Sequence, residues 1–105
     1  MNILFVHQNF PGQYRELFQW LVAQGGHEIV FLTQRKGVRP VNGARIIEYT
    51  THHKPAETTY APTKYWEECT GNGLGAAFAA QKLAAAGFRP DIILGHVGWG
   101  ELTFL

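Results

Sequence analysis

The sequence predicts a three-layer α/β/α fold built on a short parallel sheet. Three observations lead to this fold class. Short, almost continuous apolar runs recur along the chain, and they are typical of strands that helices cover on both faces. Stretches with helical character separate some of these runs, as the crossovers of a parallel sheet require. The 105 residues, 46% of them hydrophobic, are enough for the core of one domain and too few for two.

The first strand, helix and second strand follow one another at the N-terminus. The apolar run Asn2–His7 predicts a buried strand, and Gln8–Gly12 supplies turn residues after it. The spacing predicts a helix over Gln13–Gln24, because its apolar residues recur at helical intervals: Tyr14, Leu17, Phe18, Leu21 and Val22. Two glycines end this helix, and His27–Thr33 is the second predicted strand.

The middle of the chain is less regular. We expect a solvated basic loop over Gln34–Gly43 and a third, weaker strand over Ala44–Thr50, and residues 51–60 show no periodicity. Ala61–Ala86 has a helical composition, with alanines on one face that would let the helix sit close to a sheet. Glycines interrupt this stretch at positions 71, 73 and 75, so we expect a kink or two helices there.

The last predicted strand is Asp91–His96, and we expect Val97–Leu105 to form a loop with one helical turn. Right-handed crossovers then give the strand order 3-2-1-4, which is Rossmann-like. In this order the fourth strand leaves an apolar, unpaired edge. We therefore expect the chain to be the start of a larger domain, and the isolated fragment to form a homodimer through this edge.

The composition excludes several functional classes. The net charge of +1 argues against nucleic acid as the main partner, because proteins that track phosphates carry a clear basic excess. Cys69 is the only cysteine, so no internal disulfide forms, which is typical of a cytoplasmic protein. No apolar run is long enough to span a bilayer, and the N-terminus lacks the features of a signal peptide.

Open α/β sheets bind ligands beyond the carboxyl ends of their strands, where the strand order reverses. Two loops meet there in the predicted order, residues 7–13 after the first strand and 95–101 after the fourth. Gly12 precedes a helix N-terminus, whose free amides suit a phosphate, or it only makes the turn. His96 either acts on a proton or a sugar hydroxyl, or caps backbone groups, and His7 has the same two interpretations.

Two more residues of the second loop belong to this candidate site. Trp99 either offers its flat apolar face to a sugar or fills the core. Glu101 is either a carboxylate of the pocket or an acid in the first turn of a helix, where it favours the helix dipole.

Other patterns have ordinary structural explanations. Gly71–Ala76 fits the dinucleotide fingerprint G-x-G-x-x-A, but it follows a helical stretch instead of a strand, so we interpret it as a helix break. His52-His53 and Cys69 lack the spacing of metal ligands, and we expect no metal site there.

A basic loop follows the second strand, where some reductases bind a 2′-phosphate. Its cations are Arg35, Lys36 and Arg39. The first strand is not followed by a glycine fingerprint, so an ordinary basic loop is the better interpretation.

The two loops of the candidate site together resemble a known family. The opening M-N-I-L-F-V-H-Q-N-F-P-G-Q-Y is similar to the start of bacterial glycosyltransferase family 4 proteins. The stretch G-F-R-P-D-I-I-L-G-H-V-G-W-G-E-L-T-F-L, from Gly87 to Leu105, resembles a second signature of the same group. The resemblance implies the GT-B architecture, two Rossmann-like domains that face each other across a cleft. It makes residues 1–105 a truncated N-terminal domain on the acceptor side.

The resemblance also implies a chemistry. These enzymes transfer a sugar from a nucleotide-sugar donor to an acceptor with retention of configuration, without a metal or another cofactor. The implied positions are Gly12 and Gln13 for the donor phosphates, His96 for catalysis, and His7, Asn9, Trp99 and Glu101 for the acceptor side of the cleft. The C-terminal domain with the nucleotide site is missing, so we expect the isolated chain to be inactive. The resemblance leaves open whether the parent protein makes peripheral contact with a membrane.

Two other functions remain as alternatives to sugar transfer. The chain could be a small Rossmann nucleotide-binding module, which a cofactor titration would reveal. It could also be a non-catalytic interaction module that pairs through its sheet edge, which its size in solution would reveal.

Overall fold

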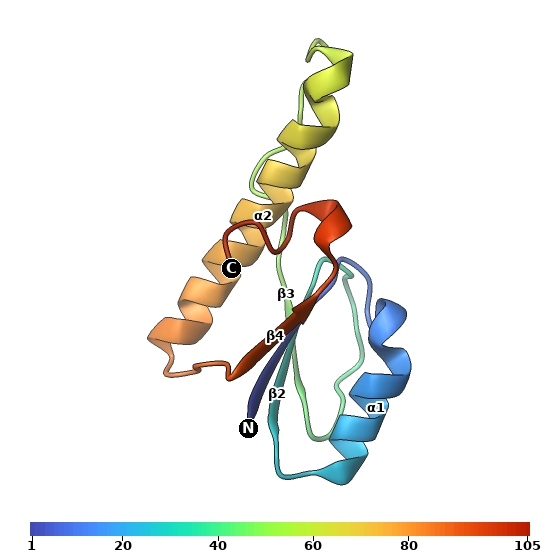
Figure 1. Ribbon diagram of the computed structural model, residues 1–105, viewed down its shortest axis with the longest axis vertical. Helices are drawn as coiled ribbons and strands as arrows, with labels where there is room; N and C mark the ends of the chain where they lie inside the picture. The colour runs from blue at the N-terminus through green and yellow to red at the C-terminus, as the bar shows by residue number, and fades with distance from the viewer.

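The computed structural model describes residues 1–105 and contains one sheet of four parallel strands in the order β3-β2-β1-β4 (Figure 1). This confirms the predicted fold class and strand order. The strands are β1 (Asn2–Val6), β2 (Glu28–Thr33), β3 (Arg45–Glu48) and β4 (Ile92–Gly95). Each strand is shorter than its apolar run, and the residue that follows β1 or β4 is a histidine.

Helices cover both faces of the sheet and give the molecule its three layers (Figure 1). A short 3-10 helix, η1 (Gly12–Tyr14), leads directly into α1 (Arg15–Gln24) on one face. The long helix α2 (Ala61–Ala85) lies on the opposite face, and its N-terminal part extends beyond the sheet. A second 3-10 helix, η2 (Val97–Trp99), follows β4 and is the helical turn that the sequence predicts. No helix of the structure is both long enough and apolar enough to cross a membrane.

Alternation along the two central strands builds two hydrophobic cores. Leu4 and Val30 are register partners that face α2, whereas Phe5 and Phe31 are register partners that face α1. On the α2 side, Ala76 is fully buried and the neighbouring alanines let the helix approach the sheet, as expected. Both faces of β1 and β2 are therefore apolar, which explains why their sequences show no polar side.

The glycines of α2 do not divide it into two helices, so the expected helix break is wrong. The helix runs without interruption through all three of them. A Cβ on Gly71 would lie 2.2 Å from the carbonyl oxygen of His53, and a Cβ on Gly75 would lie 2.1 Å from that of Thr50. No side chain fits at these distances. The glycines instead let the segment that follows β3 pack directly against the helix backbone.

The loop after β4 packs on α2 in the same way. A Cβ on Gly73 would lie 2.6 Å from the carbonyl oxygen of Gly100, and a Cβ on Gly100 would lie 2.2 Å from that of Cys69. Gly100 also has a φ of +88°, a conformation that favours glycine. As a result α2 holds the segments after β3 and β4 together at the carboxyl end of the sheet, which is where the candidate residues lie.

Candidate functional site

The loops after β1 and β4 meet at the carboxyl end of the sheet, as the strand order predicts. Val6 and Gly95 are register partners at the ends of these two strands. The next residues are His7 and His96, and their ring centroids lie 6.3 Å apart. His7 is buried, whereas His96 is partly exposed. The structure therefore brings the two predicted histidines together at the switch point.

Local hydrogen bonds orient both rings. The amide of Gly98 donates to Nδ1 of His96 over 2.9 Å, so the neutral ring carries its proton on Nε2. Nδ1 of His7 lies 3.0 Å from the amide nitrogen of Asn9 and 2.9 Å from its carbonyl oxygen. The Asn9 backbone can thus satisfy His7 in either tautomer. Asn9 acts on this site through its main chain, which the sequence alone does not indicate.

Gly12 has two structural reasons to be glycine. Its φ is +57°, a left-handed conformation that side chains rarely adopt. A Cβ here would also lie 2.7 Å from the imidazole of His7, so the ring packs against the bare backbone. The adjacent Gln13 is exposed. The turn thus supports the position of His7, a role that neither interpretation of Gly12 anticipates.

Trp99 does not fill the core. Its side chain is 41% exposed, and its ring centroid lies 5.9 Å from that of His96. The side-chain amide of Asn72, on α2, donates to the Trp99 carbonyl oxygen over 3.1 Å. The hydroxyl of Tyr65, also on α2, donates to the carbonyl oxygen of Gly98. The helix therefore fixes the backbone of this loop and leaves an aromatic face accessible beside His96.

Glu101 is buried, with 1% of its surface exposed, and neither carboxylate oxygen has a hydrogen-bond partner. It follows η2 and does not lie in the first turn of a helix, so that interpretation is wrong. Burial raises the pKa of the Glu101 carboxyl, and the nearby His7, His96 and Tyr49 act in the opposite direction. Because the effect of burial is the largest of these, the carboxyl favours its neutral, protonated form more than a solvated glutamate does.

The second of the two loops carries a family signature that comparison confirms. The family model of the glycosyl transferase family 4 group matches residues 25–105. The chain belongs to this family. The match includes His96, Trp99 and Glu101, and the loop at residues 7–13 lies outside it. No curated protein and no solved structure matches the chain.

In this family 4 domain the sequence did not predict the contacts of Tyr65 and Asn72 with the loop after β4. Besides its bond to Trp99, the Asn72 side chain accepts a hydrogen bond from Gln34 over 3.0 Å. It thereby ties the loop after β2 to the loop after β4. The available signal was an asparagine between two glycines, but that pattern indicated a helix break instead of a contact.

The patterns rejected as cofactor or metal motifs have structural roles. Gly71–Ala76 is inside α2 and follows helix, so it is not a dinucleotide fingerprint. His53 pairs with Glu67 of α2 over 2.6 Å. No group of three or more His, Cys, Asp or Glu residues is arranged to hold a metal ion.

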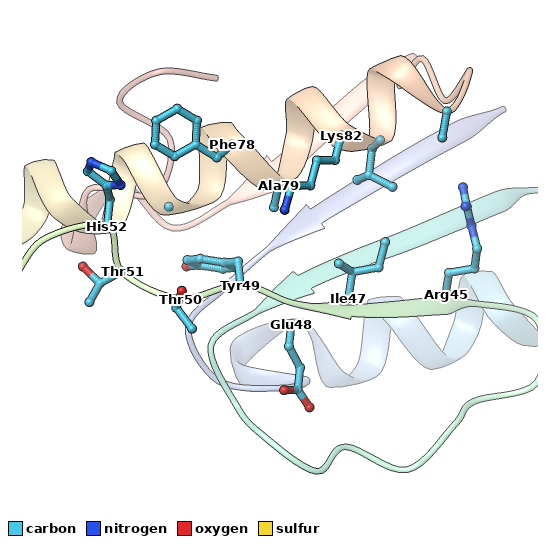
Figure 2. A pocket seen from close by; sticks show the side chains of 13 residues that line it. Arg45, Ile47, Glu48, Tyr49, Thr50, Thr51, His52, Phe78, Ala79 and Lys82 are labelled. Atoms are coloured by element: carbon cyan, nitrogen blue, oxygen red, sulfur yellow. The ribbon is translucent and has the colours of Figure 1, made fainter.

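A large groove lies elsewhere, between β3 and α2 (Figure 2). Its volume is about 710 Å³, and Tyr49, Phe78 and Lys82 are among its lining residues. At one end Arg45 is already paired with Glu28 over 2.8 Å. None of the predicted site residues lines the groove.

Proposed function

We propose that this chain is the N-terminal, acceptor-side part of a retaining glycosyltransferase with GT-B architecture. The parent enzyme would transfer a sugar from a nucleotide-sugar donor to an acceptor. The observation that supports this proposal best is the pair His7 and His96 at the ends of neighbouring strands, in a chain of the glycosyl transferase family 4 group. Sugar transfer needs a group that orients a reacting hydroxyl, and the Nε2–H of His96 can donate a hydrogen bond to the oxygen of such a hydroxyl.

Each residue of the site has a distinct role in the proposal. His96 presents Nε2 to a hydroxyl of the reacting sugar or of the acceptor, because its Nδ1 is occupied by Gly98. The exposed face of Trp99 packs against a sugar ring. Gly12 and Gln13 approach the donor phosphates. Glu101 and His7 support His96 from the buried side, and no metal or other cofactor is required.

A nucleotide-binding Rossmann module is the less favoured alternative. Its phosphate loop needs glycines between the first strand and the following helix. Here the turn from Gln8 to Gln13 contains Gly12 alone, and the His7 ring occupies the space beside it.

The experiment is a screen of the parent protein against UDP-, GDP- and ADP-sugars for turnover or donor hydrolysis. We expect His96→Ala to lower turnover about a hundredfold, the usual scale for the loss of one positioned hydrogen-bond donor. The melting temperature should change little. His52→Ala is the matched control, because His52 is exposed and lies away from the site. Binding of NAD(P) without any response to sugar nucleotides would contradict the proposal. Equal turnover in the His96 and His52 variants would remove His96 from the mechanism.

A further inference from the structure

The basic loop after β2 and the turn after β1 border an open surface cavity of about 430 Å³, a size within the usual range of small-molecule pockets. The cavity opens beside the turn after β1, at the same end of the sheet as His7 and His96. Its lining consists of Phe10, Pro11, Arg35, Lys36, Gly37, Val38, Arg39, Pro40 and Val41. The three cations of the loop are exposed, as expected of a solvated loop, and they border this cavity together.

The charged residues that line the cavity are all cations. Arg35, Lys36 and Arg39 line it, and no acidic residue does. None of the three cations has a carboxylate within ion-pair distance, since the structure's two salt bridges join Arg45 to Glu28 and His53 to Glu67. Between Glu28 and Glu48 the sequence contains no acid at all. The nearest acid in contact with the loop is Glu48, whose carboxylate accepts from the Gly37 amide and does not pair with any of the three cations.

Hydrogen bonds hold the loop in this arrangement. Nη1 of Arg35 donates to the carbonyl oxygen of Phe10 over 2.7 Å, and the Arg35 amide donates to the hydroxyl of Thr33 over 3.2 Å. The amide of Gly37 donates to the carboxylate of Glu48 over 2.8 Å. Like charges held together repel each other, and a preformed cluster of donors favours a bound anion over solvent. The remaining N–H groups of Arg35 are free to make such bonds.

We propose that this cavity binds a phosphate group of a substrate of the enzyme. Guanidinium and ammonium groups match phosphate oxygens with charge-assisted hydrogen bonds, and the apolar Phe10 and Val41 wall the same space. One continuous turn carries both features: His7 faces His96, and Phe10, three residues later, holds Arg35. A phosphate bound here would anchor a substrate whose other end reaches the histidine pair.

Two sources can supply this phosphate, the donor diphosphate or a phosphorylated acceptor. The assignment of the source rests on the proposed function, whereas phosphate binding itself does not. The test follows the backbone amides of the chain by NMR during separate titrations with inorganic phosphate, UDP, glucose 6-phosphate and glucose. We expect shifts at residues 35–41 with the three phosphate compounds and none with glucose. Tighter binding of UDP indicates the donor, and tighter binding of glucose 6-phosphate indicates the acceptor.

Charge-matched variants decide whether the loop is the site. The triple variant Arg35→Gln, Lys36→Gln, Arg39→Gln should bind phosphate at least about tenfold more weakly, because charge-assisted bonds are lost. The control is Lys54→Gln, Lys64→Gln, Lys82→Gln, which removes the same charge away from the cavity and should bind normally. If loss of the Arg35–Phe10 bond unfolds the loop in the triple variant, the single variant Arg39→Gln still tests the site. It leaves that bond intact and should also bind phosphate more weakly. Equal weakening in both triple variants, or shifts confined to the groove beside Lys82, would overturn the proposal. Phosphate binding by a parent protein that turns over no sugar nucleotide would refute the proposed function and leave this site intact.

Discussion

His7 and His96 follow register partners on neighbouring parallel strands, and both rings are bonded through Nδ1 to the backbone two residues further along the chain. The same local arrangement thus occurs twice, once after β1 and once after β4. Because each ring is held by its own loop, the 6.3 Å between their centroids is set by the sheet. A pair fixed in this way loses little freedom when a ligand binds.

Gly12 should be more sensitive to substitution than its backbone conformation alone explains. Gly12→Ala places a Cβ in a left-handed conformation, which costs about 1–2 kcal/mol, and also against the His7 ring. Gly26→Ala is the matched control, since Gly26 has a φ of +77° with open space around it. Urea unfolding should show a larger loss for Gly12→Ala, and the His7 ring resonances should shift only in that variant. Equal losses would mean that the ring yields without cost.

Gly75→Ala should destabilise the domain, although alanine is the better helix former by about 1 kcal/mol. The added Cβ would overlap the carbonyl oxygen of Thr50, and overpacking of this kind costs about 1–3 kcal/mol. Urea unfolding measures the loss. Ala85→Gly, at an exposed position of the same helix, is the control and should cost no more than about 1 kcal/mol. A more stable Gly75→Ala variant would show that the segment after β3 does not pack on α2 as described.

These glycines show where sequence reasoning reaches its limit. The strands and their order follow from apolar runs and chain connectivity, which are local signals, and they place His7 and His96 correctly. The glycines of α2 were interpreted through helix propensity, a local quantity. Their actual role depends on the carbonyl oxygens of Thr50 and His53, some twenty residues earlier in the chain. A single sequence contains no signal for such a contact.

Glu101 illustrates the same limit for the site. Its position after a buried strand indicated a pocket or a helix start, and both are solvent-accessible places. Its burial instead results from the close approach of Gly100 to Cys69, which draws the loop against α2. The cavity at the basic loop is a similar case. The charges are visible in the sequence, whereas their convergence depends on the bond from Arg35 to Phe10.

The stability of the chain relative to Glu101→Gln should fall as the pH rises. Burial raises the pKa of Glu101, so the native state holds this proton more tightly than the unfolded state does. The native state therefore loses stability relative to the unfolded state as the pH rises above 4.5, the ordinary pKa of a glutamate, and through the raised native pKa of Glu101. Glutamine mimics the protonated acid and removes this dependence.

Urea unfolding of both proteins between about pH 4 and about pH 8 tests the sign. His7 and His96 face Glu101 from the loops, and Tyr49 and Tyr65 face it from the segment after β3 and from α2. All four groups remain in both proteins. Glu57→Gln, at an exposed carboxyl, is the control. A difference that grows toward low pH would show that the carboxyl is stabilised as an anion.

The outer edge of β4 should make the isolated chain self-associate. β4 pairs with β1 on one side and has no partner on the other, so its outer backbone N–H and C=O groups are free. Ile92 is 42% exposed on this strand, and Ile93 is 37% exposed. An unpaired, apolar edge is a template for a second strand, and a two-fold pair of β4 strands is self-complementary.

Light scattering over a concentration series should therefore give a mass that rises toward that of a dimer. Ile92→Lys should keep the chain monomeric, because two lysines would face each other across the new strand pair. Ile93 is less suitable for this test, since it shares an apolar hollow with Phe104 and Leu105 and its substitution would disturb that packing. Trp20→Lys is the control: it adds the same charge at an exposed apolar position on α1, away from the edge, and should leave association unchanged. A monomer mass at every concentration would contradict edge pairing, and so would a dimer that survives Ile92→Lys but dissociates with Trp20→Lys.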